Sequence, residues 1–367
     1  MSKSQTRQKL PPVWLIKVLG SFRTFLIRLN RNLFPGNVVL YEQFQYFWLL
    51  PALYVAAKLD IATLLKTKPL TSSEISEKIG ADAPGILRIM RALASQGIFK
   101  ETRNGRFALN GMSEALLEEQ GSLRHMILHH LGPVNWNLMS NLEFTVMTGK
   151  DAFQNKYGKE IYTFLKDHPA EYAIFDKSMS NLSELGLSPI LQAYDFSKFP
   201  VIADIGGGEG YLLANILQCN PAIQGTLFDT AEALKKAPQM LAHHEVENRV
   251  KIVAGDFFRE IPPACNLYIL KNIIHNWDDI QSAQILRNVG QAMTPGATVL
   301  IIEMVVPACS TPSLAKLLDI QMMATMSGGK ERTASEFRSV IEDSGFKLRR
   351  IIPTIAPICL IEAEMIG

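Results

Sequence analysis

The feature that most constrains the fold is a change of pattern at Phe199-Pro200. From Val201 onward, short runs of apolar and β-branched residues alternate with helical stretches. The runs cover residues 201–205, 225–228, 250–253, 267–270, 298–303, 347–353 and 358–362. This alternation is typical of a parallel, doubly wound sheet covered by helices. We therefore predict an α/β domain over residues 199–367.

The residues before this domain predict further parts. A chain of 367 residues suits more than one domain. We expect a basic amphipathic extension over 1–38, a winged-helix-like domain over 39–115 and a mostly helical region over 116–198 that links them.

The extension is strongly basic. Residues 1–41 hold seven lysines and arginines and no acidic residue, a charge of +7 in a chain of net charge +2, so about −5 remains for the rest. Residues 13–29 place apolar side chains at spacings of three and four, which predicts an amphipathic helix. Two uses stay open: packing against another subunit or the protein's own body, which we favour, and contact of residues 1–35 with an anionic membrane surface.

The next segment predicts a helix–turn–helix followed by a hairpin. Residues 71–80 begin with a capping-box pattern and end at a glycine, residues 83–95 form a second apolar-faced helix, and 97–109 turn at Asn104-Gly105. These elements together make a winged helix. Only Arg88 and Arg91 make its second helix basic, so we expect it to serve dimerisation and not nucleic-acid binding.

The cysteine and hydropathy patterns bound the environment of the chain. The four cysteines (Cys219, Cys265, Cys309 and Cys359) show no metal-ligand spacing, and we expect reduced thiols. No apolar run reaches the roughly 18 residues that a membrane span needs. We expect a cytoplasmic protein, with peripheral contact at a membrane surface as the alternative use of the extension.

A glycine-rich turn follows the first strand of the α/β domain. Asp204 lies near the end of that strand, and glycines then alternate at Gly206, Gly208 and Gly210, where main-chain N–H groups can approach a ligand. The dinucleotide pattern G-x-G-x-x-G requires a third glycine at the position of Tyr211. The turn therefore indicates a nucleoside cofactor, and Tyr211 makes NAD the less favoured one.

The next two strands end in groups that suit an adenosine. Asp229 closes the second strand, where a carboxylate accepts both ribose hydroxyls in NAD-binding and other nucleoside sites alike. Asp256 and Phe257 follow the third strand. We expect Asp256 to accept from the adenine amino group and Phe257 to stack on the ring, a pair that favours S-adenosylmethionine.

The fourth strand runs into Lys271-Asn-Ile-Ile-His-Asn-Trp-Asp-Asp279. With this Lys-x-x-x-His-Asn-Trp-x-Asp segment, the sequence resembles the class I small-molecule O-methyltransferases typified by plant caffeic acid and flavonoid O-methyltransferases, and their bacterial relatives. Two more landmarks agree: Ile302-Glu-Met-Val-Val-Pro307, and Gly328-Gly-Lys-Glu-Arg-Thr333. The resemblance covers nearly the whole chain. It implies a Rossmann-like methyltransferase sheet, an N-terminal dimerisation domain, a homodimer and S-adenosylmethionine as cofactor.

The resemblance also implies roles for single residues. His275 is the expected general base, because a histidine with a pKa near 6.5 suits removal of a hydroxyl proton. Glu303 and Glu331 match the two acids that flank this base in the family. Lys271 is expected to bind the cofactor and Trp277 to cover its adenine. No metal is expected, since no cluster of carboxylates has a readable spacing.

The acceptor pocket is implied less sharply. The matching segments contain Trp136, Phe175, Met179, Met322, Met323 and Met326. Methionines adapt their shape to flat ligands, and Met326 replaces the polar Asn that the phenylpropanoid enzymes have at that position. We therefore expect O-methylation of a hydroxyl on an apolar, aromatic or polyketide-like molecule. C-methylation, an altered reaction on the same fold, and a winged-helix DNA-binding regulator are the alternatives.

Overall fold

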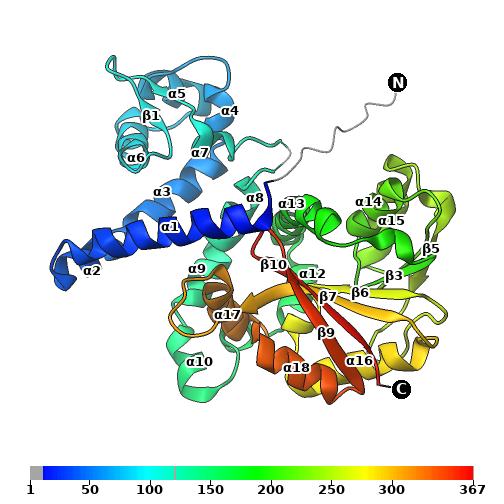
Figure 1. Cartoon of the computed structure of the whole chain (residues 1–367). Coiled ribbons are helices and arrows are strands. Elements are labelled where there is room, and N and C mark those ends of the chain that lie inside the picture. The colour runs from blue at the N-terminus through cyan, green and yellow to red at the C-terminus, as the bar shows by residue number, and fades with distance from the viewer. Residues whose placement is uncertain (1–10, 120, 367) are drawn as a thin grey trace. The chain divides into compact units, whose positions relative to one another are not determined.

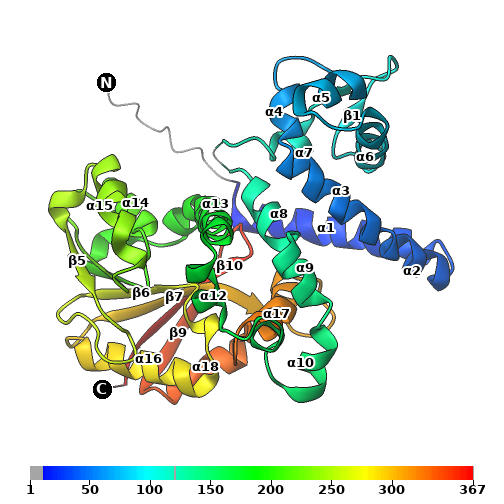
Figure 2. The same cartoon turned by 180° about the vertical axis from the view of Figure 1, so that it is seen from behind.

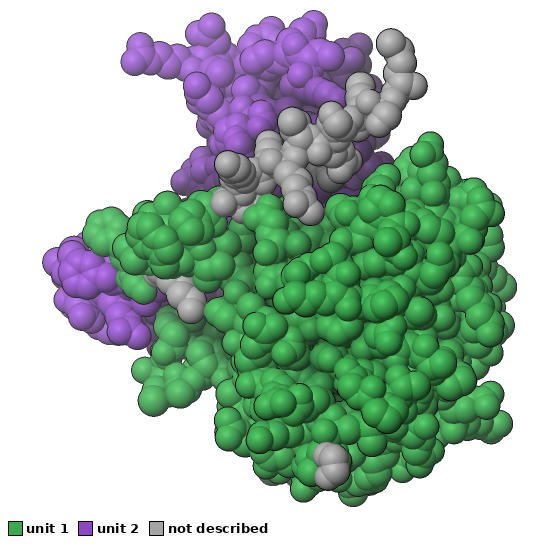
Figure 3. All heavy atoms as spheres, turned by 45° about the vertical axis from the view of Figure 1, so that its right-hand side comes forward, with its two compact units in different colours: residues 1–23, 143–158, 186–367 green, residues 24–142, 159–185 purple. Residues whose placement is uncertain are grey.

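The computed structural model describes residues 11–119 and 121–366. The chain forms two compact units, and each is assembled from separate stretches of sequence (Figure 3). The unit that holds the large sheet comprises residues 1–23, 143–158 and 186–367, and the helical unit comprises 24–142 and 159–185. The domain boundaries expected after residues 38, 115 and 198 stay predictions.

The helical unit contains the elements expected from residues 71–109. Thr71 caps helix α5 (Ser72–Ile79) through a capping box with Glu74, and Gly80 ends the helix in the left-handed conformation. Helix α6 (Ala83–Ser95) follows, and β1 (Lys100–Glu101) pairs antiparallel with β2 (Phe107–Ala108). The helices and the hairpin are confirmed one by one, whereas their combination into a winged helix stays a prediction.

This unit has a core of its own, in which Ile61, Ile75, Met90 and Phe107 are fully buried, and it contains further helices. They are α2 (Gly36–Phe44), α3 (Tyr46–Lys58), α4 (Ile61–Leu65), α7 (Gly111–Glu114), α8 (Arg124–His130), α9 (Pro133–Met139) and α12 (Ile161–Asp167).

Three helices belong partly to each unit: α1 (Val13–Asn32), α10 (Leu142–Thr148) and α13 (Pro169–Ala193). Helix α1 confirms the helix expected over residues 13–29. Its partner, whether protein or membrane, stays a prediction, and the basic residues 3, 7 and 9 lie outside the described part. Among the described helices, none combines the length and apolar character needed to cross a membrane.

The second unit is built on one mixed sheet, in the order β5-β4-β3-β6-β7-β10-β9 (Figure 1). Every predicted strand forms: β3 (Val201–Ile205), β4 (Gln224–Asp229), β5 (Val250–Ala254), β6 (Leu267–Lys271), β7 (Thr298–Val306), β9 (Phe346–Pro353) and β10 (Ile358–Met365). Short β8 (Arg332–Thr333), which the apolar pattern does not predict, pairs parallel with the end of β7. Because β3 lies between β4 and β6, the strand order reverses there, as in doubly wound folds.

One strand departs from the parallel arrangement that the sequence predicts. Strand β10 is antiparallel to both β7 and β9. Only residues 354–357 connect β9 to β10, and a connection this short can join antiparallel neighbours alone, since parallel strands need a long crossover.

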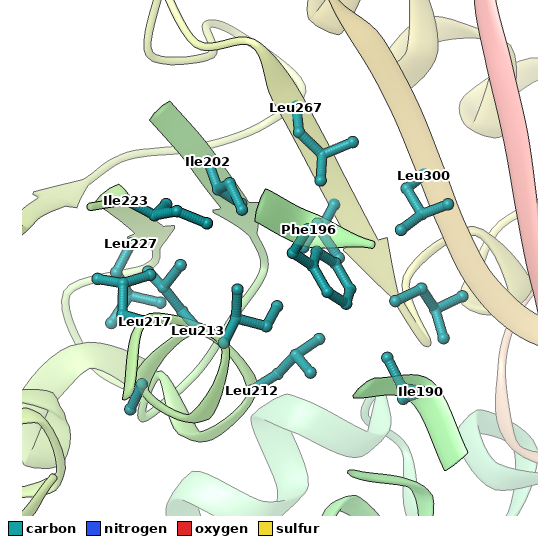
Figure 4. Packing of buried hydrophobic residues seen from close by; sticks show 14 of the residues in the cluster. Ile190, Phe196, Ile202, Leu212, Leu213, Leu217, Ile223, Leu227, Leu267 and Leu300 are labelled. Carbon is teal, nitrogen blue, oxygen red and sulfur yellow. The ribbon is translucent and has the colours of Figure 1, made fainter. Parts of the chain in front are cut away.

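Helices cover both faces of the sheet (Figures 1 and 2): α14 (Tyr211–Cys219) and α15 (Ala237–His243) on one, α16 (Asp279–Ala292) and α18 (Ala334–Glu342) on the other. Figure 4 shows the first interface, where Leu213 and Leu217 of α14 meet strand residues such as Ile202 and Leu227. Complete burial of such a side chain contributes about 1.5–3 kcal/mol, so this packing fixes α14 and the turn before it.

The remaining elements of the unit are α11 (Ala152–Tyr157), α17 (Leu314–Thr325) and the short 3-10 helices η1 (Phe196–Lys198), η2 (Ala233–Lys236), η3 (Glu247–Arg249) and η4 (Ile274–Asn276).

Candidate active site at the carboxyl ends of the parallel strands

The parallel strands bring most of the predicted site residues to one edge of the sheet. Strands β3, β4, β5, β6 and β7 run in the same direction, and the predicted residues lie at or just beyond their carboxyl ends. Open α/β sheets bind ligands at this edge, at the point where the strand order reverses. The sheet therefore gathers groups that are up to about a hundred residues apart in sequence.

The surroundings of the glycine turn after β3 differ between its first and second glycine. Gly206 and Gly208 have positive φ angles of 70° and 57°. A Cβ at Gly206 would lie 2.3 Å from Ile273 Cδ1, so only glycine lets this turn pack against the segment after β6. At Gly208, a Cβ would meet nothing within 4 Å. The turn is therefore closely packed at its first glycine and open beside its second.

Asp229 connects the end of β4 to this turn. Its Oδ2 accepts a hydrogen bond of 2.9 Å from the Gly208 N–H, and its Oδ1 accepts one of 2.6 Å from the Thr230 N–H. Burial raises the pKa of Asp229, although these hydrogen bonds act in the opposite direction. The carboxylate thus has a structural function in the loop, and its four lone-pair positions leave capacity for ligand hydroxyls.

The buried Asp204 and the half-buried Lys271 are groups of opposite charge on the neighbouring strands β3 and β6. Asp204 is 2% exposed, and this burial raises its pKa to about 7, against the attraction of the Lys271 charge. Burial likewise lowers the pKa of Lys271. Both predicted cofactor residues therefore lie in a poorly hydrated part of the edge.

The two aromatic residues predicted beside the cofactor meet each other. The ring of Phe257 lies 6.1 Å from that of Trp277, and Phe258 lies edge-on to Trp277 at 4.7 Å. Phe258 was not predicted, although it adjoins Phe257 in the sequence. Asp256 is exposed and accepts a hydrogen bond of 2.9 Å from the Phe258 N–H, so its carboxylate also stabilises the local turn.

His275 and the two predicted glutamates come together at the centre of the edge. The His275 Nδ1 lies 2.8 Å from Glu331 Oε1, and the backbone N–H of His275 donates to Glu303 Oε1 at 3.0 Å. Glu303 is fully buried on β7, and Glu331 is 4% exposed. One oxygen of each glutamate, Oε2, is buried with no hydrogen-bond partner among the described residues. The structure brings these three residues together, and their catalytic roles stay predictions.

The two carboxylates change the proton affinity of the imidazole. Burial by itself would lower the pKa of His275, but the hydrogen bond to Glu331 and the charges of Glu303 and Glu331 raise that pKa above its usual value. Burial raises the pKa of Glu303. The arrangement therefore favours a proton on the His275 ring.

Two residues that sequence reasoning did not assign hold this group in place. Asp319 of α17 accepts a hydrogen bond of 2.8 Å from the Glu331 N–H. Arg332 is fully buried and contacts the chain on both sides of His275. The available signal was the position of Arg332 beside Glu331 in the segment Gly328–Thr333, which the family resemblance already marks.

The residues predicted to line an acceptor pocket are divided between the two units. Trp136 lies 5.9 Å from the Phe47 ring, and Phe175 lies edge-on to His129 at 5.4 Å. These residues and Met179 belong to the helical unit, whereas Met322, Met323 and Met326 belong to the sheet unit, in or next to α17. Their common pocket stays a prediction. Within the described residues, no group of three or more His, Cys, Asp or Glu side chains is arranged to hold a metal.

Comparison with known proteins identifies the family of the chain. A family model described as an O-methyltransferase domain matches residues 139–347, and one described as an O-methyltransferase dimerisation domain matches 41–119. Phenazine O-methyltransferase PhzM of Lysobacter antibioticus is 36% identical over 90% of this chain and 97% of its own length.

Two solved structures extend the similarity to three dimensions. The crystal structure of LaPhzM, 35% identical, superimposes with a TM-score of 0.85 over 91% of this chain and 100% of that one. The neocarzinostatin-biosynthesis O-methyltransferase NcsB1 is 28% identical, with a TM-score of 0.74 over 86% of this chain and 96% of its own; its structure holds S-adenosylmethionine and 2-hydroxy-5-methyl naphthoic acid.

The buried Asp204 predicts a defined pH dependence of stability. Its pKa of about 7 in the folded chain exceeds the value of about 3.9 of an unfolded carboxyl, so the folded state binds this proton more tightly. The contribution of Asp204 to the free energy of unfolding therefore becomes less favourable to the folded state as the pH rises from about 4 to 7. Asparagine does not titrate. We expect the melting temperature of Asp204→Asn, relative to the unmodified chain, to increase between about pH 5 and pH 8.

Thermal unfolding of both proteins across this range measures the effect. Asp343→Asn, which removes an exposed carboxyl of the same unit, is the control for the loss of a negative charge. A difference between Asp204→Asn and the unmodified chain that stays constant from pH 5 to pH 8 contradicts the prediction.

Proposed function

The chain belongs to the family of S-adenosylmethionine-dependent O-methyltransferases, and from this premise we propose that His275 is the general base of its reaction. The observation that carries the proposal is the 2.8 Å contact between His275 Nδ1 and Glu331 Oε1. A carboxylate can only accept, so the imidazole Nδ1 carries the hydrogen and Nε2 is the nitrogen that takes a proton.

The two glutamates make this proton transfer favourable. A phenolic hydroxyl has a pKa of about 10 and is mostly neutral near pH 7, so a base must remove its proton as the oxygen becomes a nucleophile. The imidazolium that forms at His275 is stabilised by Glu331 at Nδ1 and by the negative charge of Glu303 beneath its backbone N–H. Glu331 also restricts the orientation of the ring, and Glu303 holds the backbone that carries it. Positioning of reacting groups as a whole is worth roughly 7–11 kcal/mol in well-aligned reactions.

We also propose which residues bind the cofactor, because the groups at the carboxyl ends of the parallel strands suit S-adenosylmethionine. The Trp277 Nε1–H is buried with no hydrogen-bond partner among the described residues. A Cβ placed at Gly208 would meet no atom within 4 Å, so there is room for a ligand beside this glycine. When bound, the cofactor supplies the methyl group on its sulfonium. Asp229 would bind the ribose hydroxyls, and Phe257 and Trp277 would contact the adenine.

The remaining cofactor assignments concern the ends of the molecule. Asp256 would accept a hydrogen bond from the adenine amino group. Its carboxylate would then either keep its hydrogen bond from the Phe258 N–H or give that bond up. The Gly206 turn, with Asp204 and Lys271 beneath it, would receive the amino acid and sulfonium end. The opposite charges of Asp204 and Lys271 suit a zwitterionic amino acid group.

The acceptor is proposed to be a hydroxylated fused-ring aromatic molecule. Phenazine O-methyltransferase is named for a fused-ring molecule, and the NcsB1 structure holds a hydroxylated naphthoic acid. In this chain, Trp136 and Phe175 supply flat apolar surfaces, and the methionines of α17 supply an adaptable one. The dimerisation model over 41–119 supports a second copy of the chain as partner, whereas contact of residues 1–35 with a membrane has no support in these similarities.

Replacement of His275 tests the base assignment. We expect His275→Gln to lower the turnover rate about 10²- to 10⁴-fold, because it removes the proton acceptor, and to leave the affinity for S-adenosylhomocysteine unchanged. Steady-state kinetics and calorimetry measure the two quantities. His243→Gln, at an exposed position in α15, is the matched control. Turnover of His275→Gln at the level of the unmodified enzyme would exclude His275 as the base.

An acceptor panel tests the substrate class. We expect the enzyme, supplied with S-adenosylmethionine, to methylate a hydroxyphenazine and a hydroxynaphthoic acid in preference to a single-ring hydroxybenzoate, because a fused ring buries more apolar surface. Mass spectrometry of the products locates the added methyl group. Preference for the single ring, or a methyl group on carbon or nitrogen, contradicts the proposal.

A further inference from the structure

Arg332 is the largest side chain with complete burial in the described part of the chain. It lies on β8, next to Glu331 in sequence, and its guanidinium makes four hydrogen bonds. Nη1 donates to the carbonyl of Ile274 at 3.0 Å, and Nη2 donates to the carbonyl of Trp277 at 2.8 Å and to Ser282 Oγ at 3.1 Å. Nε donates to Asp279 Oδ1 at 2.9 Å.

The two carbonyls bound by Arg332 enclose the segment that carries His275. Ile274 begins η4 and Trp277 follows its end, so one planar group holds both sides of this 3-10 turn. The Ser282 hydroxyl donates to the same two carbonyls, at 3.2 and 3.3 Å. Backbone carbonyls of a turn this short have few partners within the turn itself, and Arg332 supplies donors from 55 or more residues away.

The segment that contains Arg332 also holds Glu331, the hydrogen-bond partner of the His275 ring. Glu331 precedes Arg332, and the Lys330 N–H donates to the carbonyl of His275 at 2.9 Å. Residues 330–332 therefore contact the His275 segment at its carbonyl, its ring and both of its sides. A displacement of η4 relative to β8 would change the 2.8 Å contact between His275 Nδ1 and Glu331.

We propose that Arg332 is a positioning residue for the reaction: it holds the η4 turn so that His275 meets Glu331 and Glu303 together. Asp279 orients the guanidinium, and Lys330 contacts the other Asp279 oxygen at 2.8 Å. This role rests on the proposed function of His275 as base. Lysine would retain the charge of Arg332, but an ammonium lacks the planar fork that reaches two carbonyls and a carboxylate at once.

Arg332→Lys tests the role, with kinetics as a function of pH. We expect kcat to fall about ten- to a hundredfold, because small displacements of reacting groups have effects of this size. We also expect the rising limb of the pH profile of kcat/KM to move to lower pH, because a weaker contact with Glu331 lowers the pKa of His275. Arg350→Lys is the control, because it alters a forked pair between the exposed Arg350 side chain of β9 and Glu362 of β10, away from the His275 segment.

Asp279→Asn provides a second test if Arg332→Lys does not fold. The Asp279 side chain is 51% exposed, and its replacement weakens the orientation of Arg332 without removing a buried charge. We expect a smaller fall in kcat with the same direction of pH shift. Normal kcat and an unmoved pH profile in either folded variant would overturn the positioning role. Full activity of His275→Gln would instead refute the base assignment, so the two failures are distinguishable.

Discussion

The hydrogen bond between His275 Nδ1 and Glu331 Oε1 is the interaction on which the proposed chemistry depends. It determines which imidazole nitrogen carries hydrogen, it raises the proton affinity of the ring, and it limits ring rotation. Only 14% of the His275 side chain and 1% of the Glu331 side chain are exposed. Water therefore screens the interaction weakly, which makes it stronger than a surface pair of the same length.

The doubly wound sheet places these groups next to the predicted cofactor residues. Strand β6 ends at Lys271 and leads into the His275 turn, while its neighbour β7 carries Glu303 and pairs with β8 just after Glu331. On the other side, β3 leads into the glycine turn. The predicted cofactor residues and the proposed base thus lie at the same edge because parallel strands align their carboxyl ends.

Local sequence patterns predicted the strands, the glycine turn and the capped helix α5, because each depends on residues only a few positions apart. They did not predict the reversed direction of β10, since an apolar run is the same in either direction. The meeting of His275 with Glu331 came from resemblance to a family and not from spacing. Asp319 and Arg332 were not assigned because their contacts join segments 12 and 55 or more residues apart. The acceptor residues are divided between two units, so sequence pattern alone cannot test their common pocket.

The central claim, that Glu331 holds His275 with Nδ1 protonated and Nε2 ready to accept a proton, can be measured without turnover. Two-bond proton–nitrogen NMR of the ¹⁵N-histidine-labelled enzyme, with His275→Gln for assignment, reports both the tautomer and the pKa of this ring as the pH is varied. The account predicts a neutral form with hydrogen on Nδ1 and a pKa above the usual value of about 6.5. A neutral form with hydrogen on Nε2, or a pKa below that value, would contradict it.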